Sequence, residues 1–380
     1  MRILIAAGGT GGHIYPALAV LRRLAERGAE PEVRWVGGHR GLESATVPAA
    51  GYRLHRLSLR TLRTVELDQH VLMDPIRLAL SVPEAAALML HWRPDVIYTT
   101  GGYVAIPVLS AALALRVPSL MWEGNRIPGR SVRAVARLAS AIALSYPDAS
   151  DHLAGRTYVT GTPIRSFAGV DREGARAALD LPADVPLVLV FGGSQAVRRF
   201  DAAVEAALPR LVDRCVVLHV TGESAYPDAL RRRDTLPAER RDRYRPYPFL
   251  REEMTAALRA ADLLVGRAGS STLAEATALG VPMVVVPYPH AGAHQSANAR
   301  EMADAGAARF IADEAFDGDA LVDACALLDD APAREAMSAA SRALGRPGAA
   351  DANAELLTAL AERHPLPDAA TIERLTRDAA

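Results

Sequence analysis

The sequence predicts an α/β protein made of two doubly wound halves, each a parallel sheet covered by helices on both faces. Three observations lead to this prediction. A short apolar strand runs into a glycine-containing loop and then a helix at three places, starting at residues 2, 187 and 262. Strand and helix patterns alternate along the chain, which is typical of parallel sheets. The 380 residues suffice for two domains of ordinary size.

The composition excludes several classes of protein. Two cysteines, Cys215 and Cys325, argue against a disulfide framework, and we expect both to be buried in the core. All 43 basic residues are arginine, so a Walker A lysine and a Schiff-base lysine are impossible. No N-terminal signal peptide is visible, and prolines interrupt the longest apolar run, Val104–Met121, so we expect no membrane span.

The net charge of −1 conceals a difference between the two halves. Residues 1–150 contain 17 arginines against 11 acidic residues, a balance of +6, whereas the remainder balances at −7. The first half is therefore better suited to an anionic partner.

The first glycine loop, Gly8–Gly12, is followed directly by His13 and a helix predicted for Ile14–Arg27. Its four glycines permit close approach of a ligand to the backbone. The spacing is not G-x-G-x-x-G, and the next strand, Val33–Val36, ends in glycine instead of an acid, which disfavours a nicotinamide site. His13 stands where a general base would be needed, although a single histidine at such a junction is more often structural.

The richest set of polar groups lies in residues 262–298. A buried strand leads through Gly266–Gly269 to a helix that begins at Ser270–Thr272, whose hydroxyls we expect to cap it. The start of this helix suits a diphosphate, and Glu275 is placed to accept hydrogen bonds from two ribose hydroxyls. The polar residues that follow the next strand are His290, His294, Gln295 and Asn298. An ordinary strand–turn–helix remains the alternative for the glycines and serines alone.

Other strands of the pattern also end in polar loops. These loops are Thr100–Tyr103 after the strand at 94–98, Glu123–Asn125 after the strand at 119–122, and Gly192–Gln195 after the strand at 187–191. Because open parallel sheets bind ligands beyond the carboxyl ends of their strands, these loops mark the candidate sites.

Three further segments carry open interpretations. Residues 51–93 interleave arginines with leucines, which fits a surface docking on anionic lipid and, equally, a solvated face beside core leucines. The arginine-rich residues 230–245 are expected to be solvated. Asp317-Gly318-Asp319 matches a D-x-D metal pattern, but two acids before a helix predict a cap. We place the hinge between the halves at residues 160–165, and a helix at 349–363 returning to the first half.

Seven ordered blocks of this chain resemble the MurG family of peptidoglycan N-acetylglucosaminyltransferases, glycosyltransferase family 28. The blocks are GGTGGH (8–13), TGGYVAIP (100–107), WEGN (122–125), TGTPIR (160–165), GGSQ (192–195), GRAGSSTLAE (266–275) and HQSANA (294–299). The resemblance implies the GT-B fold, with two Rossmann-like doubly wound domains facing across a cleft and a C-terminal helix returning to the first. It places an acceptor- and membrane-facing domain at 1–163, a UDP-sugar-binding domain at 164–345, and the returning helix with the tail at 346–380.

The resemblance also implies a reaction. This is inverting transfer of N-acetylglucosamine from UDP-GlcNAc to the 4-hydroxyl of lipid I, undecaprenyl-pyrophosphoryl-MurNAc-pentapeptide, giving lipid II for peptidoglycan synthesis. No cofactor or metal is implied. The implied partners are a UDP-sugar donor, a lipid-linked anionic acceptor and the cytoplasmic face of the cell membrane, on which the protein would be peripheral; no nucleic acid is implied.

Carried over by motif, the implied catalytic residues are His13 and Glu275. The implied substrate-binding residues are Thr10, Gly11, Gly12, Tyr103, Asn125, Arg165, Ser194, Gln195, Leu250, Arg267, Gly269, Ser270, Ser271, Thr272 and Gln295. Such a reaction needs a base near the attacking hydroxyl and donors for the departing diphosphate. We assign His13 as the base, and Ser194, Arg165 and the helix start at 270–272 to the leaving group.

The remaining roles also follow from the resemblance. Glu275 would hold the ribose and Gln295 the sugar hydroxyls, while the backbone at 249–250 would contact uracil. The first glycine loop and the turn at 101–103 would face the acceptor diphosphate.

Two segments differ from the family pattern. Trp122-Glu123-Gly124-Asn125 stands where the family reads HEQN, and Gly292-Ala293 stand where an acid usually precedes His-Gln. Three alternatives stay open: another GT-B glycosyltransferase with a small-molecule or different lipid acceptor, a UDP-GlcNAc 2-epimerase, and a non-catalytic sugar-nucleotide-binding subunit. The motifs contain no paired carboxylates for epimerase chemistry, which ranks that alternative lower.

Overall fold

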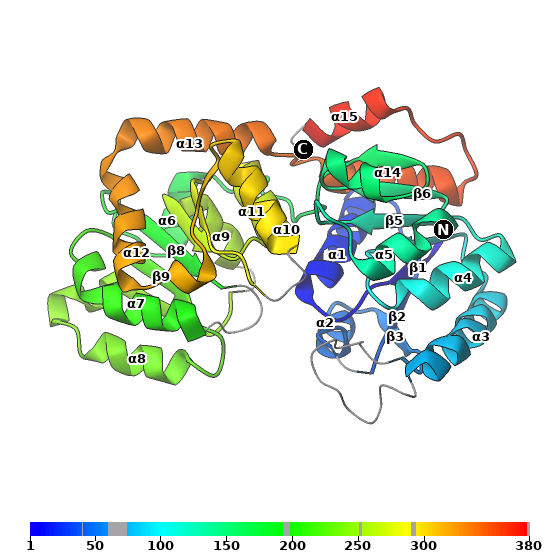
Figure 1. The fold of residues 1–380 in the computed structure, drawn as a ribbon, viewed down its shortest axis with the longest axis horizontal. Helices are drawn as coiled ribbons and strands as arrows, with labels where there is room; N and C mark the ends of the chain where they lie inside the picture. Colours follow the sequence, from blue (N-terminus) through cyan, green and yellow to red (C-terminus); the bar gives the residue numbers. More distant parts are fainter. Residues whose placement is uncertain (40, 60–73, 193–197, 251–252, 290–293, 378–380) are drawn as a thin grey trace. The chain divides into compact units, whose positions relative to one another are not determined.

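The computed structural model describes residues 1–39, 41–59, 74–192, 198–250, 253–289 and 294–377 (Figure 1). The chain divides into two compact units, Met1–Arg165 with Arg346–Ala380, and Ser166–Gly345. The first division lies two residues beyond the boundary that the family resemblance implies, at the end of the hinge expected at residues 160–165, and the chain from Arg346 onward belongs to the first unit.

The first unit is built on a seven-stranded parallel sheet. Its strands are β1 (Arg2–Ala6), β2 (Glu32–Gly37), β3 (Arg53–Arg56), β4 (Val96–Thr99), β5 (Ser119–Glu123), β6 (Ala141–Leu144) and β7 (Thr157–Val159). They lie in the order β3-β2-β1-β4-β5-β6-β7. The strand order reverses between β1 and β4, which is where a doubly wound sheet opens a crevice for ligands. His13, in the first turn of the helix after β1, and Thr100, in the loop after β4, follow these two strands.

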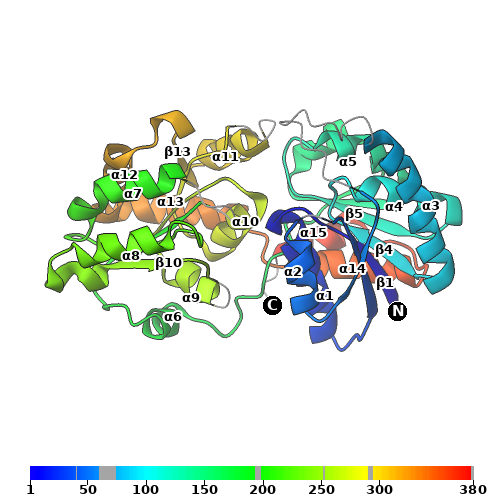
Figure 2. The same cartoon turned by 90° about the horizontal axis from the view of Figure 1, so that it is seen from below.

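Helices cover both faces of this sheet (Figure 2). They are α1 (Gly11–Glu26), α2 (Glu43–Ala49), α3 (Asp74–Trp92), α4 (Ala105–Leu115), α5 (Arg130–Val135), α14 (Ala349–Ala361) and α15 (Ala369–Arg377). Alternation along β1 sets the two cores: Ile3 and Ile5 pack with α1 and α14, while Leu4 and Ala6 pack with α3 and α4. Because both faces of β1 pack against apolar side chains, its sequence is a continuous hydrophobic run.

The second unit repeats the arrangement with six parallel strands in the order β10-β9-β8-β11-β12-β13. The strands are β8 (Leu187–Phe191), β9 (Val216–Val220), β10 (Tyr244–Tyr247), β11 (Leu263–Gly266), β12 (Met283–Val285) and β13 (Ala308–Phe310). Its helices are α6 (Arg172–Ala178), α7 (Arg198–Leu211), α8 (Tyr226–Asp234), α9 (Glu253–Ala260), α10 (Ser270–Leu279), α11 (His294–Asp304), α12 (Gly318–Ala324) and α13 (Ala331–Leu344). The prediction of two doubly wound sheets is confirmed.

The arginine-rich residues 230–245 are not a simple solvated segment as expected. They end in β10, which the sequence patterns missed because Pro246 and arginines interrupt it. β10 is an edge strand, and proline is tolerated there because one side of the strand has no hydrogen-bonded neighbour in the sheet. Tyr244 of this strand is fully buried, and Arg232 and Arg233 form ion pairs with Glu205 and Asp242.

Two smaller expectations, on the cysteines and on Asp317, are confirmed. Cys215 and Cys325 are buried free thiols. Asp317 caps α12 because its Oδ1 accepts a hydrogen bond of 2.9 Å from the Ala320 amide. The described residues contain no group of three or more His, Cys, Asp or Glu side chains arranged to hold a metal ion. None of the described helices is both long and apolar enough to cross a membrane.

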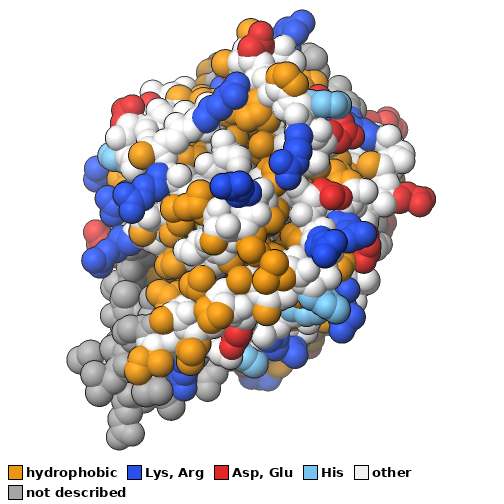
Figure 3. Space-filling view, turned by 90° about the vertical axis from the view of Figure 1, so that its right-hand side faces the viewer, with side chains coloured by type: hydrophobic (Ala, Val, Ile, Leu, Met, Phe, Trp, Pro, Cys, Tyr) orange, Lys and Arg blue, Asp and Glu red, His pale blue; other side chains and the backbone are white. Residues whose placement is uncertain are grey.

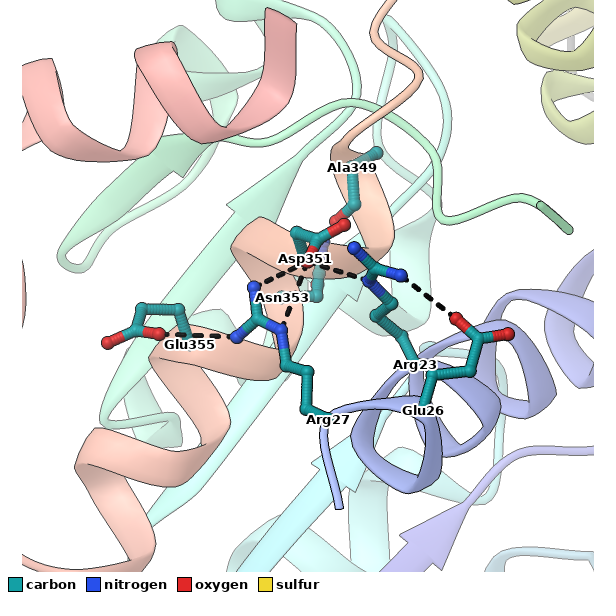
Figure 4. Close-up of polar contacts among 7 residues, drawn as sticks. All are labelled: Arg23, Glu26, Arg27, Ala349, Asp351, Asn353 and Glu355. Carbon is teal, nitrogen blue, oxygen red and sulfur yellow. Dashed lines mark hydrogen bonds and ion pairs between the residues drawn. The ribbon is translucent and has the colours of Figure 1, made fainter. Parts of the chain in front are cut away.

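The last helices return to the first unit through a polar lock (Figure 4). Asp351 of α14 accepts hydrogen bonds from Arg23 Nε at 2.7 Å and Arg27 Nη2 at 2.5 Å, both from α1. Two residues on, the fully buried Asn353 accepts from the Tyr98 hydroxyl at 3.2 Å and donates to Thr160 Oγ1 at 3.0 Å. These directional contacts fix the register of α14 over the sheet.

We expect Asp351→Asn to lower the free energy of unfolding by about 1–3 kcal/mol, since it removes a charge-assisted acceptor shared by two arginines. Glu355→Gln is the matched control on the same helix. Its carboxylate also meets Arg27, at 3.3 Å, but its side chain is 45% exposed, against 12% for Asp351. The control should cost less than about 1 kcal/mol. Urea denaturation measures the free energy of unfolding of both variants. Equal losses would mean that the buried Asp351 carboxylate stabilises the protein no more than the exposed Glu355 carboxylate does.

Candidate active site

Thr100 holds His13 at the start of α1 by two hydrogen bonds. His13 Nδ1 lies 2.6 Å from the Thr100 carbonyl oxygen, and Thr100 Oγ1 donates to the His13 carbonyl at 2.9 Å. A carbonyl oxygen can only accept, so Nδ1 carries the proton and Nε2 keeps its lone pair. The ring is therefore fixed in the tautomer that a general base requires.

Glycines face the basic nitrogen. Gly101 and Gly102 have φ of +83° and +73°, and a Cβ added to Gly102 would lie 3.8 Å from His13 Nε2. Burial lowers the pKa of His13, while its hydrogen bond to Thr100 and the charge of Glu43 act in the opposite direction. The imidazole is accordingly neutral at physiological pH and able to take a proton.

The start of α1 leaves the backbone exposed at Thr10 and Gly12, whereas Gly11 is buried. The helix begins at Gly11 after the exposed Thr10, which forms no side-chain cap with the described residues. Gly12 is exposed, and a Cβ there would meet only Thr10 Oγ1, at 3.8 Å. The first N–H groups of a helix have no partner within it, and they attract anions.

The first unit contains three other residues that the family resemblance implies bind substrate: Tyr103, Asn125 and Arg165. The Tyr103 ring is buried in the apolar core beside Leu4 and Val36, and its hydroxyl lies where a Cβ of Gly38 would stand. Asn125 donates to Glu123 Oε1 through its backbone N–H at 2.8 Å and its side-chain amide at 2.9 Å. Burial raises the pKa of Glu123. Arg165 is half-buried at the end of this unit.

The start of α10 in the second unit differs from expectation. Gly269 occupies the cap position, so the predicted capping by the hydroxyls of residues 270–272 is wrong. Ser271 Oγ is instead buried with no hydrogen-bond partner among the described residues. A buried hydroxyl without a partner costs about 1–3 kcal/mol. Together with the unpaired N–H groups of the first turn, it marks a place that an acceptor-rich ligand would complete.

The loop after β12 and helix α11 lie beside this helix start. Gln295 Oε1 accepts from the Tyr288 amide at 2.9 Å, and the buried Asn298 donates to the Ala268 carbonyl at 3.4 Å. These bonds join the polar residues following β11 and β12. Glu275 is half-buried on α10, four residues beyond Ser271 and therefore on the same face.

Arg267 serves the framework of the second unit. Its guanidinium is buried and donates from Nη1 to Asp313 Oδ1 at 2.6 Å and to the Val286 carbonyl at 3.0 Å. It also stacks 4.9 Å from the Phe200 ring centroid and 5.5 Å from that of Tyr288. These contacts anchor the loops after β11 and β12 to α7. Leu250 is buried after β10, while Ser194, Gln195 and His290 lie outside the described residues.

Sequence reasoning missed a buried polar network at the carboxyl end of β9. His219 Nδ1 lies 3.1 Å from the Tyr244 hydroxyl, and its Nε2 lies 3.4 Å from Asp201 Oδ1. Burial lowers the pKa of His219 to about 3 and raises that of Asp201 to about 6. The histidine is thus a neutral link between β9, β10 and α7. The sequence signal that could have revealed this network is the histidine within the otherwise apolar strand 216–220.

Comparison with known proteins assigns the fold to a family. Residues 3–144 match the glycosyltransferase family 28 N-terminal domain, and residues 187–355 match the family's C-terminal domain. A protein of Limosilactobacillus fermentum named UDP-N-acetylglucosamine–N-acetylmuramyl-(pentapeptide) pyrophosphoryl-undecaprenol N-acetylglucosamine transferase is 37% identical over 359 residues, covering 92% of this chain and 96% of that protein.

Solved structures agree with this assignment. The crystal structure of MurG from Acinetobacter baumannii superposes with a TM-score of 0.72 at 26% identity, over 94% of this chain and 99% of that one. The glycosyltransferase of kitacinnamycin, at 22% identity and a TM-score of 0.67 over 99% of both chains, shares the fold. The chain is therefore a hexosyltransferase of the GT-B fold and belongs to glycosyltransferase family 28.

Proposed function

We propose that this protein transfers N-acetylglucosamine from UDP-GlcNAc to the 4-hydroxyl of lipid I with inversion, giving lipid II. The observation that carries the proposal is the near full-length relationship at 37% identity to a transferase whose name states this reaction. Both units supply chemistry that suits it: a fixed neutral imidazole in the first, and an anion-binding helix start in the second.

The donor belongs in the second unit. The unpaired N–H groups at the start of α10 and the Ser271 hydroxyl would bind the diphosphate of UDP-GlcNAc. Glu275, one turn further along that face, would accept hydrogen bonds from the ribose, and Gln295 would contact the sugar. The backbone beside Leu250 would meet uracil. These donors would stabilise the leaving diphosphate, a task that some glycosyltransferases give to a metal ion.

The acceptor belongs in the first unit. The accessible N–H groups of α1 would hold its diphosphate, close to the imidazole of His13. His13 Nε2 would take the proton of the sugar 4-hydroxyl while that oxygen forms a bond to C1 of N-acetylglucosamine. The bond from C1 to the diphosphate oxygen breaks on the opposite face, and UDP leaves with the electron pair. Because the attacking oxygen bonds to C1 on the face opposite the departing diphosphate, this single displacement inverts the configuration at C1.

An apolar surface on the first unit supports docking on a membrane. Four large hydrophobic side chains are exposed there: on α3, Ile76 at 51%, Leu80 at 54% and Leu90 at 61%, and on α4, Leu113 at 57%. Figure 3 shows hydrophobic side chains gathered on this face with arginines around them. Such a combination favours an anionic lipid surface, in which a lipid-linked acceptor would be held.

The transfer reaction is tested with labelled UDP-GlcNAc and a lipid I analogue, beside other UDP-sugars and dTDP-sugars. We expect a disaccharide product with N-acetylglucosamine. His13→Ala should lower kcat about 10²–10⁴-fold, since it removes the base, and leave UDP binding intact. Preference for another donor or acceptor would support a different GT-B transferase. Formation of UDP-ManNAc would support an epimerase, and binding without turnover would support a non-catalytic subunit. Unchanged turnover in His13→Ala would exclude His13 as the base.

Ser271→Ala separates binding from folding. Removing a buried hydroxyl without a partner should leave the free energy of unfolding unchanged or higher, whereas UDP affinity should fall about tenfold with the lost hydrogen bond. Calorimetry with UDP and thermal melting of the free protein measure the two effects. Ser338→Ala is the control, because this hydroxyl already donates to the Gly280 carbonyl at 2.7 Å. It should lose stability and keep its UDP affinity; the same pattern in Ser271→Ala would contradict the donor site.

Leu80→Asp should weaken binding to anionic phospholipid vesicles about tenfold or more, since it loses apolar burial and adds a repelled charge. Co-sedimentation measures the change. Ala370→Asp, an exposed position on α15, adds the same charge at another helix and should leave vesicle binding as it is. Equal effects of the two substitutions would argue that net charge alone, and not the surface of α3 and α4, controls binding.

A further inference from the structure

Glu43 joins the loops that follow β1 and β2. It is the first residue of α2 and is fully buried. Its Oε2 accepts a hydrogen bond of 2.8 Å from the Gly9 amide, and its Oε1 accepts one of 3.2 Å from the Gly38 amide. One carboxylate therefore ties the glycine loop before His13 to the neighbouring loop of the same sheet edge.

Glycines enclose this carboxylate. A Cβ at Gly8 would lie 2.8 Å from Glu43 Oε1, and one at Gly37 would lie 2.9 Å from Glu43 Cγ. Gly41, with φ of +144°, would bring a Cβ closer still. Three glycines are thus needed to admit the Glu43 side chain, and not only to let a ligand approach the backbone.

Burying a carboxylate away from water costs free energy, so a buried Glu43 indicates a role beyond packing. The Gly9 N–H donates to Glu43 and is not available to a ligand. A ligand would therefore bind the N–H groups at the start of α1. Burial lowers the pKa of His13. The Thr100 carbonyl on the loop after β4 and the charge of Glu43 on α2 both oppose that shift, while Gly101 and Gly102 present no side chain.

We propose that Glu43 is a positioning residue for the transfer reaction, holding the glycine loop 8–12 in place beside the His13 imidazole. The inference rests on the proposed function in that His13 is taken as the base. It adds a residue outside the catalytic centre that holds the loop before that base, and whose charge favours the protonated imidazole.

Glu43→Gln tests the role with a side chain of the same size. It loses the charge and turns an N–H toward one of the two glycine amides. We expect kcat to fall about tenfold or more, because small displacements of a reacting group are costly. The acid limb of the kcat–pH profile should move to lower pH, and UDP binding should stay unchanged.

The His13 ring gives a readout that does not depend on turnover. In protein labelled on the histidine ring, assigned with His13→Gln, NMR titration should show a lower pKa for His13 in Glu43→Gln than in wild type. Glu26→Gln is the matched control: it removes the same charge from the exposed end of α1 and should change neither profile. An unaltered His13 titration with an unaltered pH profile in Glu43→Gln would overturn the proposal. If wild type transfers no sugar, the titration still decides the effect on His13.

Gly8→Ala covers the case in which Glu43→Gln does not fold. The added methyl group would press on Glu43 Oε1 and displace the loop while the charge remains. Transfer should fall, and the His13 pKa should stay close to that of wild type. Normal transfer by a folded Gly8→Ala protein would contradict the positioning role.

Discussion

Backbone N–H groups without a partner at the start of a helix are the constraint on which both sites depend. A parallel sheet brings the carboxyl ends of its strands to one edge, and each following helix begins there with unpaired donors. Glycines stand in the loops before α1 and α10, and neither cap residue, Thr10 or Gly269, caps its helix with a side chain of the described residues. The sheets therefore present partial positive charge at the two places where the strand order reverses.

The two helix starts are completed in different ways. At α1 the neighbouring Thr100 orients an imidazole, and the proton on His13 Nδ1 leaves Nε2 as the basic atom. At α10 the hydroxyl of Ser271 has no partner among the described residues. One site is thus prepared to accept a proton and the other to donate hydrogen bonds, which is the division of work that a sugar transfer from a diphosphate requires.

Much of the fold could be predicted from the sequence, since β1, β8 and β11 are short apolar runs before glycine loops. The edge strand β10 could not, because Pro246 and the arginines are compatible with a strand that pairs on one side only, with β9, and its edge position is not visible in the sequence. Among the site residues, the loop positions of His13 and Ser271 follow from their motifs. The buried roles of Arg267 and Tyr103 do not, because burial depends on partners such as Asp313 and Gly38, which are remote in sequence. Glu43 was equally hidden, for only the assembled sheet edge brings it to Gly9.

The second unit is an insertion within the first. The chain leaves the first unit at Arg165 and re-enters it at Arg346, whose Cβ lies 2.8 Å from the position of a Cβ at Gly161. During synthesis on the ribosome, the core around β5 and β7 thus lacks α14 and α15 until the whole inserted unit has emerged. The inserted unit has a continuous chain and can fold as soon as it has emerged, since domains generally fold as units. Its maturation would precede that of the N-terminal one, which reverses the usual order of folding along a polypeptide.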